Sequence, residues 1–235
     1  SALTALQYGD GNVAVGYDAL AAIGVEELRN VAIGLGAMSL MDEGSGSNVN
    51  YNIAIGYEAL KGRDKGSAVG DIEHNIAIGN RALGSADFAE TTSEQTGTIA
   101  IGASALAALT TGAGNIAVGY QAMLAADGAE DSNVAIGYQA MLSVDHDAAD
   151  DNVVIGHSAG TGGKAALSSC IVIGSAAMNS TAANTQTGTI AIGSSALTSL
   201  TSGARNVAIG YEAGLGITEG DDNTALGYEA LKTKI

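Results

Sequence analysis

Residues 156–160 read Gly-His-Ser-Ala-Gly, which matches the Gly-x-Ser-x-Gly pattern of a serine nucleophile held on a tight turn. The pattern follows an apolar run at 153–155, as the nucleophile turn of an α/β-hydrolase does. In those enzymes an acid and then a histidine follow the serine along the chain, yet no histidine occurs after His157. The same five positions also fit a phrase that recurs along the whole chain. We therefore interpret Ser158 as part of a structural turn and predict no catalytic residue.

A second glycine-rich stretch, Gly-Thr-Gly-Gly-Lys at 160–164, resembles part of a phosphate-binding loop. That loop needs a glycine five residues before its last glycine, and a serine or threonine after the lysine to bind Mg²⁺. Ser158 and Ala165 stand at these two positions. We therefore interpret the stretch as a turn and expect no cofactor.

The candidate metal ligands are histidines and turn carboxylates. The three histidines show no metal-ligand spacing with one another, and we expect them at the surface: His74, His146 and His157. Four aspartates in two consecutive turns are weak calcium candidates: Asp127, Asp131, Asp145 and Asp147. Ca²⁺ takes about six to eight oxygen ligands, but the chain lacks an EF-hand loop and the nonapeptide of calcium β-rolls. A solvated acidic edge that opposes lateral aggregation is the preferred interpretation, with calcium binding left open.

One phrase organises the whole chain: Asn, two or three apolar residues, Gly, two variable residues and Ala. It first occurs at 12–19 as Asn-Val-Ala-Val-Gly-Tyr-Asp-Ala, and in three copies another residue replaces the leading Asn. Successive central glycines lie between 17 residues (Gly102 to Gly119) and 23 residues (Gly56 to Gly79) apart. The twelve central glycines are Gly16, Gly34, Gly56, Gly79, Gly102, Gly119, Gly137, Gly156, Gly174, Gly193, Gly210 and Gly227.

Units of this length are too short for packed pairs of helices, which need about 33 residues or more. Two strands of about five residues and two turns fit each unit. The sequence therefore predicts an all-β fold, a parallel β-solenoid (β-roll or β-helix) of about twelve coils of 17–23 residues, as a single repeat domain at 1–235. The first residues, Ser-Ala-Leu at 1–3, have the form of the end of an earlier repeat, so we expect the chain to be a fragment of a longer fibre.

The composition agrees with a thin interior of small side chains. The 235 residues include 34 glycines, 8 tyrosines, one phenylalanine, no tryptophan and no proline, and the absence of proline suits continuous strand pairing. There are 9 Lys and Arg against 25 Asp and Glu, a net charge of −16, which excludes the basic surface typical of nucleic-acid binders. No apolar run reaches the roughly 20 residues of a membrane span, so we expect no membrane insertion. The single cysteine, Cys170, occupies the Asn position of its repeat.

The strand of the phrase is apolar on both faces. In Asn-Val-Ala-Ile-Gly the side chains alternate, so Val and Ile face one way while Asn and Ala face the other. The opposite wall of the coil covers one face, and a neighbouring chain is the simplest cover for the other. Asn at equivalent corners is predicted to stack as a hydrogen-bonded ladder. Six tyrosines follow a central glycine, and we interpret them as packing residues, with sugar stacking as the alternative: Tyr17, Tyr57, Tyr120, Tyr138, Tyr211 and Tyr228.

Three consecutive units are longer than the rest, with insertions around 41–51, 61–74 and 84–96. We expect them to emerge from the same corner of the solenoid, where insertions on one face often form a binding surface. The candidates within them for binding a receptor or partner are Tyr51, Lys61, Arg63, Lys65 and Phe88. Loop drift without function is the alternative, and the sequence leaves both open.

The phrase Asn-Val-Ala-Ile-Gly-Tyr-Glu-Ala at 206–213 resembles the repeats of phage tail fibres, including fibres that carry a cleavable C-terminal chaperone. It also resembles the head repeats of YadA-type trimeric autotransporter adhesins, which are left-handed parallel β-rolls. The longer unit and the Gly-Tyr-x-Ala-Leu continuation favour the phage version. The resemblance implies left-handed coils and assembly as a homotrimer.

These resemblances imply a structural and adhesive fibre segment that is not an enzyme. A phage tail fibre belongs to the virion and takes part in host attachment, so its partners would be a host cell-surface receptor or glycan, or adjacent virion proteins. The alternative is the head of a bacterial trimeric adhesin at the bacterial cell surface, which binds host or matrix surfaces. Flanking sequence would separate the two, because a C-terminal membrane β-barrel indicates an autotransporter and a virion-attachment or chaperone domain indicates a phage.

Overall fold

The computed structural model describes residues 2, 9–21, 28–41, 48–62, 71–84, 95–144, 146–162, 167–180 and 185–233. These residues form an all-β parallel β-solenoid of about nine turns and contain no helix, which confirms the predicted fold class. In these ranges no helix is long and apolar enough to cross a membrane. Contacts divide the chain into an N-terminal unit (Ser1–Asn115 with Asp127–Ala129) and a C-terminal unit (Ile116–Ala126 with Glu130–Ile235).

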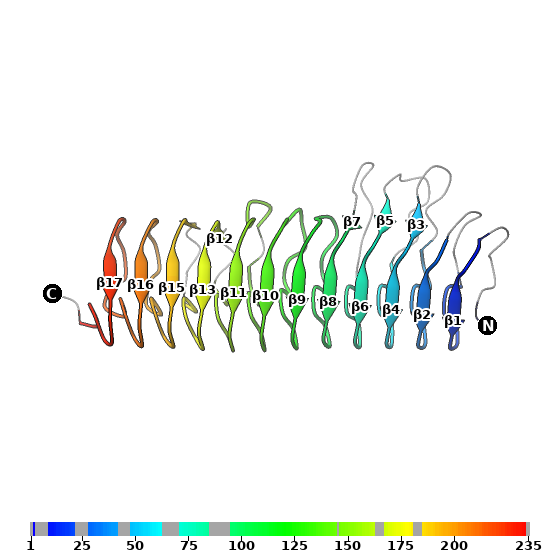
Figure 1. Cartoon of the computed structure of the whole chain (residues 1–235), viewed down its shortest axis with the longest axis horizontal. Coiled ribbons are helices and arrows are strands. Elements are labelled where there is room, and N and C mark those ends of the chain that lie inside the picture. The colour runs from blue at the N-terminus through cyan, green and yellow to red at the C-terminus, as the bar shows by residue number, and fades with distance from the viewer. Residues whose placement is uncertain are drawn as a thin grey trace. The chain divides into compact units, whose positions relative to one another are not determined.

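In the N-terminal unit, each coil contributes one three-residue strand to a parallel sheet. The register aligns the central alanines, for example Ala32 with Ala54 and Ala54 with Ala77. In spatial order the strands are β1 (Val13–Val15), β2 (Val31–Ile33), β4 (Ile53–Ile55), β6 (Ile76–Ile78) and β8 (Ile99–Ile101) (Figure 1). A second parallel sheet, formed where the expanded coils return, holds β3 (Val49–Asn50), β5 (Ile72–Glu73) and β7 (Gln95–Thr96).

The C-terminal unit repeats this arrangement with unexpanded coils. Its strands pair in parallel in the order β9 (Ile116–Val118), β10 (Val134–Ile136), β11 (Val153–Ile155), β13 (Ile171–Ile173), β15 (Ile190–Ile192), β16 (Val207–Ile209) and β17 (Thr224–Leu226). A second pairing joins β12 (Leu167–Ser168) to β14 (Gln186–Thr187). Each unit is therefore held by the same coil-to-coil ladder.

The strands are shorter than the two five-residue strands per coil expected from the repeat length, and that expectation was wrong. Each three-residue strand ends before the central glycine, whose φ is 134° at Gly34 and 137° at Gly56. A Cβ on Gly34 would lie 2.7 Å from the carbonyl carbon of Gly56, so the stacked backbones require glycine. The next residues turn through left-handed conformations, as at Glu58 (φ 51°) and Leu60 (φ 45°). A turn therefore replaces the second long strand.

The interior of each coil is narrow and filled by small or unbranched side chains. The strand-centre alanine and the Ala-Leu pair of the turn are fully buried at Ala54, Ala59 and Leu60. The turns also bond from coil to coil, since the Leu60 N–H donates to the Ala82 carbonyl over 2.9 Å. This packing agrees with the thin interior that the composition predicts.

The predicted asparagine ladder is confirmed. The N–H and the Nδ2 of Asn52 both donate to Asn30 Oδ1, over 3.0 and 3.1 Å, and Asn75 repeats both bonds to Asn52 Oδ1. All three asparagines are fully buried. Cys170 occupies one ladder position, where its N–H donates to Asn152 Oδ1 over 2.9 Å and burial raises the pKa of its thiol. The ladder thus supplies partners for polar groups at a dry corner.

Candidate interaction surfaces

The turn at 156–160 has the form of the other repeat turns. Ser158 adopts φ 52°, and its N–H donates to the Tyr138 carbonyl over 2.9 Å. The His157 ring stacks on the Tyr138 ring, with their centres 5.1 Å apart. The described residues contain no helix, whereas a nucleophile turn joins a strand to a helix. The geometry therefore agrees with the structural interpretation of Ser158.

The acidic turns show hydrogen bonds between coils. The Asp131 N–H donates to Asp150 Oδ1 over 2.8 Å, which links successive turns. Of the calcium candidates, Asp127, Asp131 and Asp147 are described, while Asp145 lies outside the described residues. Within the described ranges, no three His, Cys, Asp or Glu side chains are arranged to hold a metal ion. Calcium binding by these turns stays a prediction.

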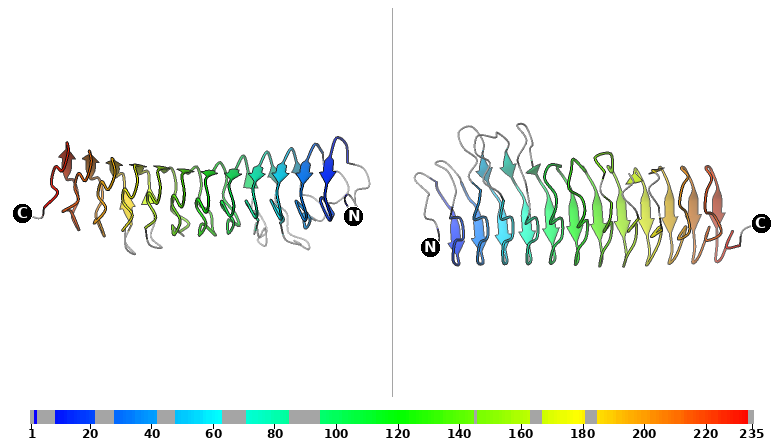
Figure 2. Two further views of the ribbon diagram at one scale, coloured as in Figure 1. Left: turned by 90° about the horizontal axis from the view of Figure 1, so that it is seen from below. Right: turned by 180° about the vertical axis from the view of Figure 1, so that it is seen from behind.

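In both units, the outer face of the ladder of three-residue strands is largely apolar. The first and third residues of each strand face outward, and we call these columns of Val and Ile the sheet face. The exposed members are Thr224 and the apolar residues Val13, Val15, Ile33, Ile55, Ile101, Ile136, Ile171 and Leu226. Figure 2 shows that, in each unit, the three-residue strands of this ladder lie along one side of the coils. The predicted alternation is confirmed, and no described part of the chain covers this face.

The tyrosines that follow central glycines form stacks on the surface. Tyr120 stacks on Tyr138 at 5.3 Å between ring centres, and Tyr138 stacks on His157 at 5.1 Å. Tyr211 and Tyr228 stack at 5.3 Å. Because each ring covers a face of its neighbour, the faces needed to stack on a sugar are partly occupied within these files. The arrangement favours packing over sugar binding for these rings.

The candidate Tyr51 lies in a mixed stack that sequence reasoning did not find. Arg29 Nη1 donates to Tyr51 Oη over 2.8 Å, and the guanidinium lies 5.5 Å from the Tyr51 ring centre. On the other side, the His74 ring stacks on Tyr51 at 4.9 Å. Each of the three residues immediately precedes a ladder asparagine, and that shared position is the signal that could have revealed the stack.

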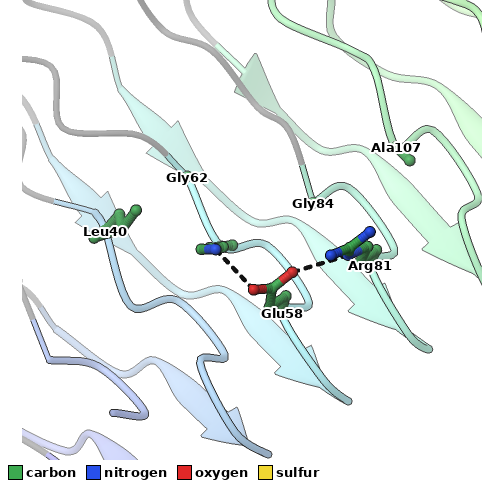
Figure 3. Close-up of a pocket in the computed structure, with 7 residues that line it drawn as sticks. Leu40, Glu58, Gly62, Arg81, Gly84 and Ala107 are labelled. Atoms are coloured by element: carbon green, nitrogen blue, oxygen red, sulfur yellow. Dashed lines mark hydrogen bonds and ion pairs between the residues drawn. The ribbon is translucent and has the colours of Figure 1, made fainter.

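The candidate Lys61 lies in a charged cluster with Glu58 and Arg81, which we call the Glu58 cluster. Figure 3 shows Glu58 and Arg81 within the lining of the adjacent cavity. Lys61 Nζ donates to Glu58 Oε1 over 2.7 Å, and Arg81 Nε donates to Glu58 Oε2 over 2.9 Å. These bonds hold the pKa of Glu58 below its ordinary value, the Lys61 bond having the largest effect, against desolvation that raises it. The Arg81 guanidinium also lies 5.8 Å from the centre of the Tyr57 ring. The cluster therefore combines two cations, one carboxylate and an aromatic ring.

Two adjoining cavities border this cluster, and we call them together the Glu58 groove. One holds about 400 Å³ and is lined by Leu40, Glu58, Lys61, Gly62, Arg81, Gly84 and Ala107. The other holds about 480 Å³, shares Leu40, Glu58 and Lys61, and adds residues of two preceding turns, including Tyr17 and Leu35. The groove thus crosses successive coils of the N-terminal unit.

The groove lies where the three expanded coils begin. Leu40, Gly62 and Gly84 are at or next to the last described residue before each insertion, and all three line one cavity. The return strands β3, β5 and β7 pair side by side. For their described flanks, this confirms that the insertions leave from one corner. The binding candidates Arg63, Lys65 and Phe88 lie outside the described residues.

Comparisons of this chain with protein-family models, with curated proteins and with solved structures found no match. The function is therefore argued from the repeat, the sheet face and the Glu58 groove.

Proposed function

We propose that this chain is a structural and adhesive fibre segment, in the first place a segment of a phage tail fibre that takes part in host attachment. In this proposal the coils of both units form one run of twelve, wound left-handed, and three chains assemble side by side. The segment projects and binds, and it catalyses no reaction.

The observation that carries the proposal is the uncovered sheet face. Apolar residues such as Ile55 (36% exposed) and Ile136 (37% exposed) recur from coil to coil and present hydrocarbon to solvent. Covering one half-exposed Val or Ile gains about 1 kcal/mol. The gain recurs at each coil, so the interface grows with the length of the repeat. A second and third copy of the same chain offer a cover of matching spacing.

Net charge favours a specific interface over general association. The charge of −16 makes copies repel one another wherever their charged surfaces meet. In the three-residue strands that form the sheet face, every residue is Val, Ile, Leu, Ala or Thr, so none is charged. Association through this face therefore avoids the repulsion that other contacts would meet.

Sedimentation equilibrium of the purified chain tests the assembly. We expect a mass of three times the 23.1 kDa chain, and a stable monomer would overturn the proposal. Ile136→Lys places charges in the sheet face and should dissociate the trimer at micromolar concentration. Tyr138→Lys is the matched control, because Tyr138 lies in the same coil and is 46% exposed outside that face. Equal dissociation by both variants would contradict a role for the sheet face.

A further inference from the structure

We propose that the Glu58 groove binds a saccharide that carries a carboxylate, with Lys61 and Arg81 holding the carboxylate. The inference rests on the proposed attachment function and names the chemistry of the ligand. It is argued from charge, from hydrogen-bond capacity and from the lining of the groove.

Within the groove, the cavity lined by Lys61, Arg81 and Glu58 has an excess of cations, whereas the adjoining cavity is also lined by the carboxylate of Asp18. Between positions 29 and 81 the chain has six Asp and Glu residues and five of its nine Lys and Arg residues. Two of them, Lys61 and Arg81, converge on the single carboxylate of Glu58, which leaves the cluster with a net charge of +1. On a chain with net charge −16, such a site selects an anion by contrast with its surroundings.

Both cations keep hydrogen-bonding capacity for a ligand. An ammonium group has three N–H donors and a guanidinium has five, while the bonds to Glu58 use one N–H of each. The Arg81 side chain is 59% exposed and the Lys61 side chain 32%, against 14% for Glu58. Glu58 therefore lies beneath the two cations and fixes their positions. A carboxylate above them meets preorganised, charge-assisted donors.

The lining beside the cations fits a ring-shaped ligand. Gly62 and Gly84 have no side chains, and Leu40 presents an apolar surface between the two cavities. The adjoining cavity adds Tyr17, which is 68% exposed, and Leu35, which is 50% exposed. A sugar ring has an apolar C–H face for such residues and hydroxyls for the charged ones. A free phosphate ion would use the cations alone, so the apolar part of the groove argues for an acidic sugar.

The second cluster of the chain shows why the site is assigned here. Lys232 Nζ lies 2.6 Å from Glu212 Oε2 and 2.7 Å from Glu229 Oε1. This cluster of one lysine and two glutamates therefore has a net charge of −1. Arg205 pairs with Asp222 over 2.6 Å and also lies 3.6 Å from Asp221. Of these three ion-paired clusters of described residues, only the Glu58 cluster has more cations than carboxylates.

The test is titration calorimetry of the full 235-residue chain with trigalacturonic acid and with its methyl ester, which keeps the sugar rings and removes the charges. We expect binding of the acid that weakens as salt is raised, and at least about tenfold weaker binding of the ester. Arg81→Gln and Lys61→Gln should each weaken binding of the acid about tenfold. Equal affinity for acid and ester would overturn the proposal.

Arg205→Gln is the matched control, because Arg205 is also 59% exposed and also bonds a carboxylate through Nε. It should leave affinity unchanged, and a loss equal to that of Arg81→Gln would overturn the site. A hexaglutamate peptide tests the ring requirement, and binding as tight as that of the trisaccharide would overturn the saccharide assignment. Sedimentation of the same samples separates the two proposals. An intact trimer that does not bind contradicts only the ligand, and a binding monomer contradicts only the assembly.

Discussion

The Glu58 cluster of the N-terminal unit and the Lys232 cluster of the C-terminal unit use the same repeat positions with opposite net charge. In both, the lysine stands five residues after its central glycine, and the partners stand two residues after theirs. Glu58 forms ion pairs with two cations, whereas Lys232 forms ion pairs with two carboxylates. The repeat therefore sets the positions of the charged side chains. One residue of each cluster, Arg81 or Glu212, sets its net charge.

The pKa values follow this difference in charge. Lys61 and then Arg81 lower the pKa of Glu58, while desolvation opposes them. Glu212 and then Glu229 raise the pKa of Lys232 above its ordinary value. In each cluster, the two like charges thus stabilise the ionised form of the single opposite charge, which is Glu58 in one and Lys232 in the other. The two units therefore share a backbone but present surfaces of opposite preference to a charged ligand.

The largest expected difference concerns the glycines that carry the two clusters. A Cβ on Gly56 would lie 2.7 Å from the carbonyl carbon of Gly79, whereas a Cβ on Gly227 meets no atom within 4 Å. Both positions have positive φ, 137° and 120°. Gly227→Ala should therefore cost only backbone strain, about 1–2 kcal/mol. Gly56→Ala adds a backbone collision and should cost about 3 kcal/mol or more.

Thermal unfolding of both alanine variants at one protein concentration measures this difference. We expect the melting temperature of Gly56→Ala to lie well below that of Gly227→Ala. Similar melting temperatures would mean that the coils separate easily at Gly56, and the stacked-glycine account of the turn would then be wrong.

Features that occupy the same repeat position in every coil could be predicted from the sequence. The parallel solenoid, the buried asparagine ladder and the outward Val and Ile followed from spacing and alternation alone. Strand length was overestimated, because a repeat length divided by two leaves out the turn that left-handed residues such as Glu58 and Leu60 make.

Contacts between unlike side chains at the variable positions of neighbouring coils were not predicted, because they depend on register. Glu58 and Arg81 are 23 residues apart, a distance that includes an insertion, so sequence separation conceals their shared position. Counting from each central glycine reveals it, since both residues are second after the glycine. The same counting places Arg29, Tyr51 and His74 in one stack. The chemistry of this chain therefore depends on position within the coil more than on local motifs.

A second, smaller difference concerns the loss of each lysine. Lys232→Gln leaves Glu212 and Glu229 facing each other without a cation, while Lys61→Gln leaves Glu58 paired with Arg81. We therefore expect Lys232→Gln to lower the melting temperature by about 1–3 °C, and Lys61→Gln by less. High salt should reduce the difference, because it screens the exposed carboxylates. A larger loss for Lys61→Gln would contradict the charge account.

The smallest effect is a dependence of stability on pH. The pKa of Glu58 is lower in the folded chain than in the unfolded chain. At pH values between these two pKa values the unfolded chain binds more protons, so the stability of the fold rises with pH in that range. The contribution of Glu58 is fully present above the unfolded value of about 4.3 and is lost as pH falls through the folded pKa. The melting temperatures of the wild-type chain and Glu58→Gln, measured from pH 7 to pH 2.5, should differ by about 1–3 °C at neutral pH and converge below pH 4. The difference in melting temperature between the wild-type chain and Glu212→Gln should be smaller, since Lys232 keeps Glu229 as its partner. A gap that stays constant to pH 2.5 would show that the Glu58 carboxylate does not stabilise the fold through its charge, and the two clusters would then differ in ligand preference alone.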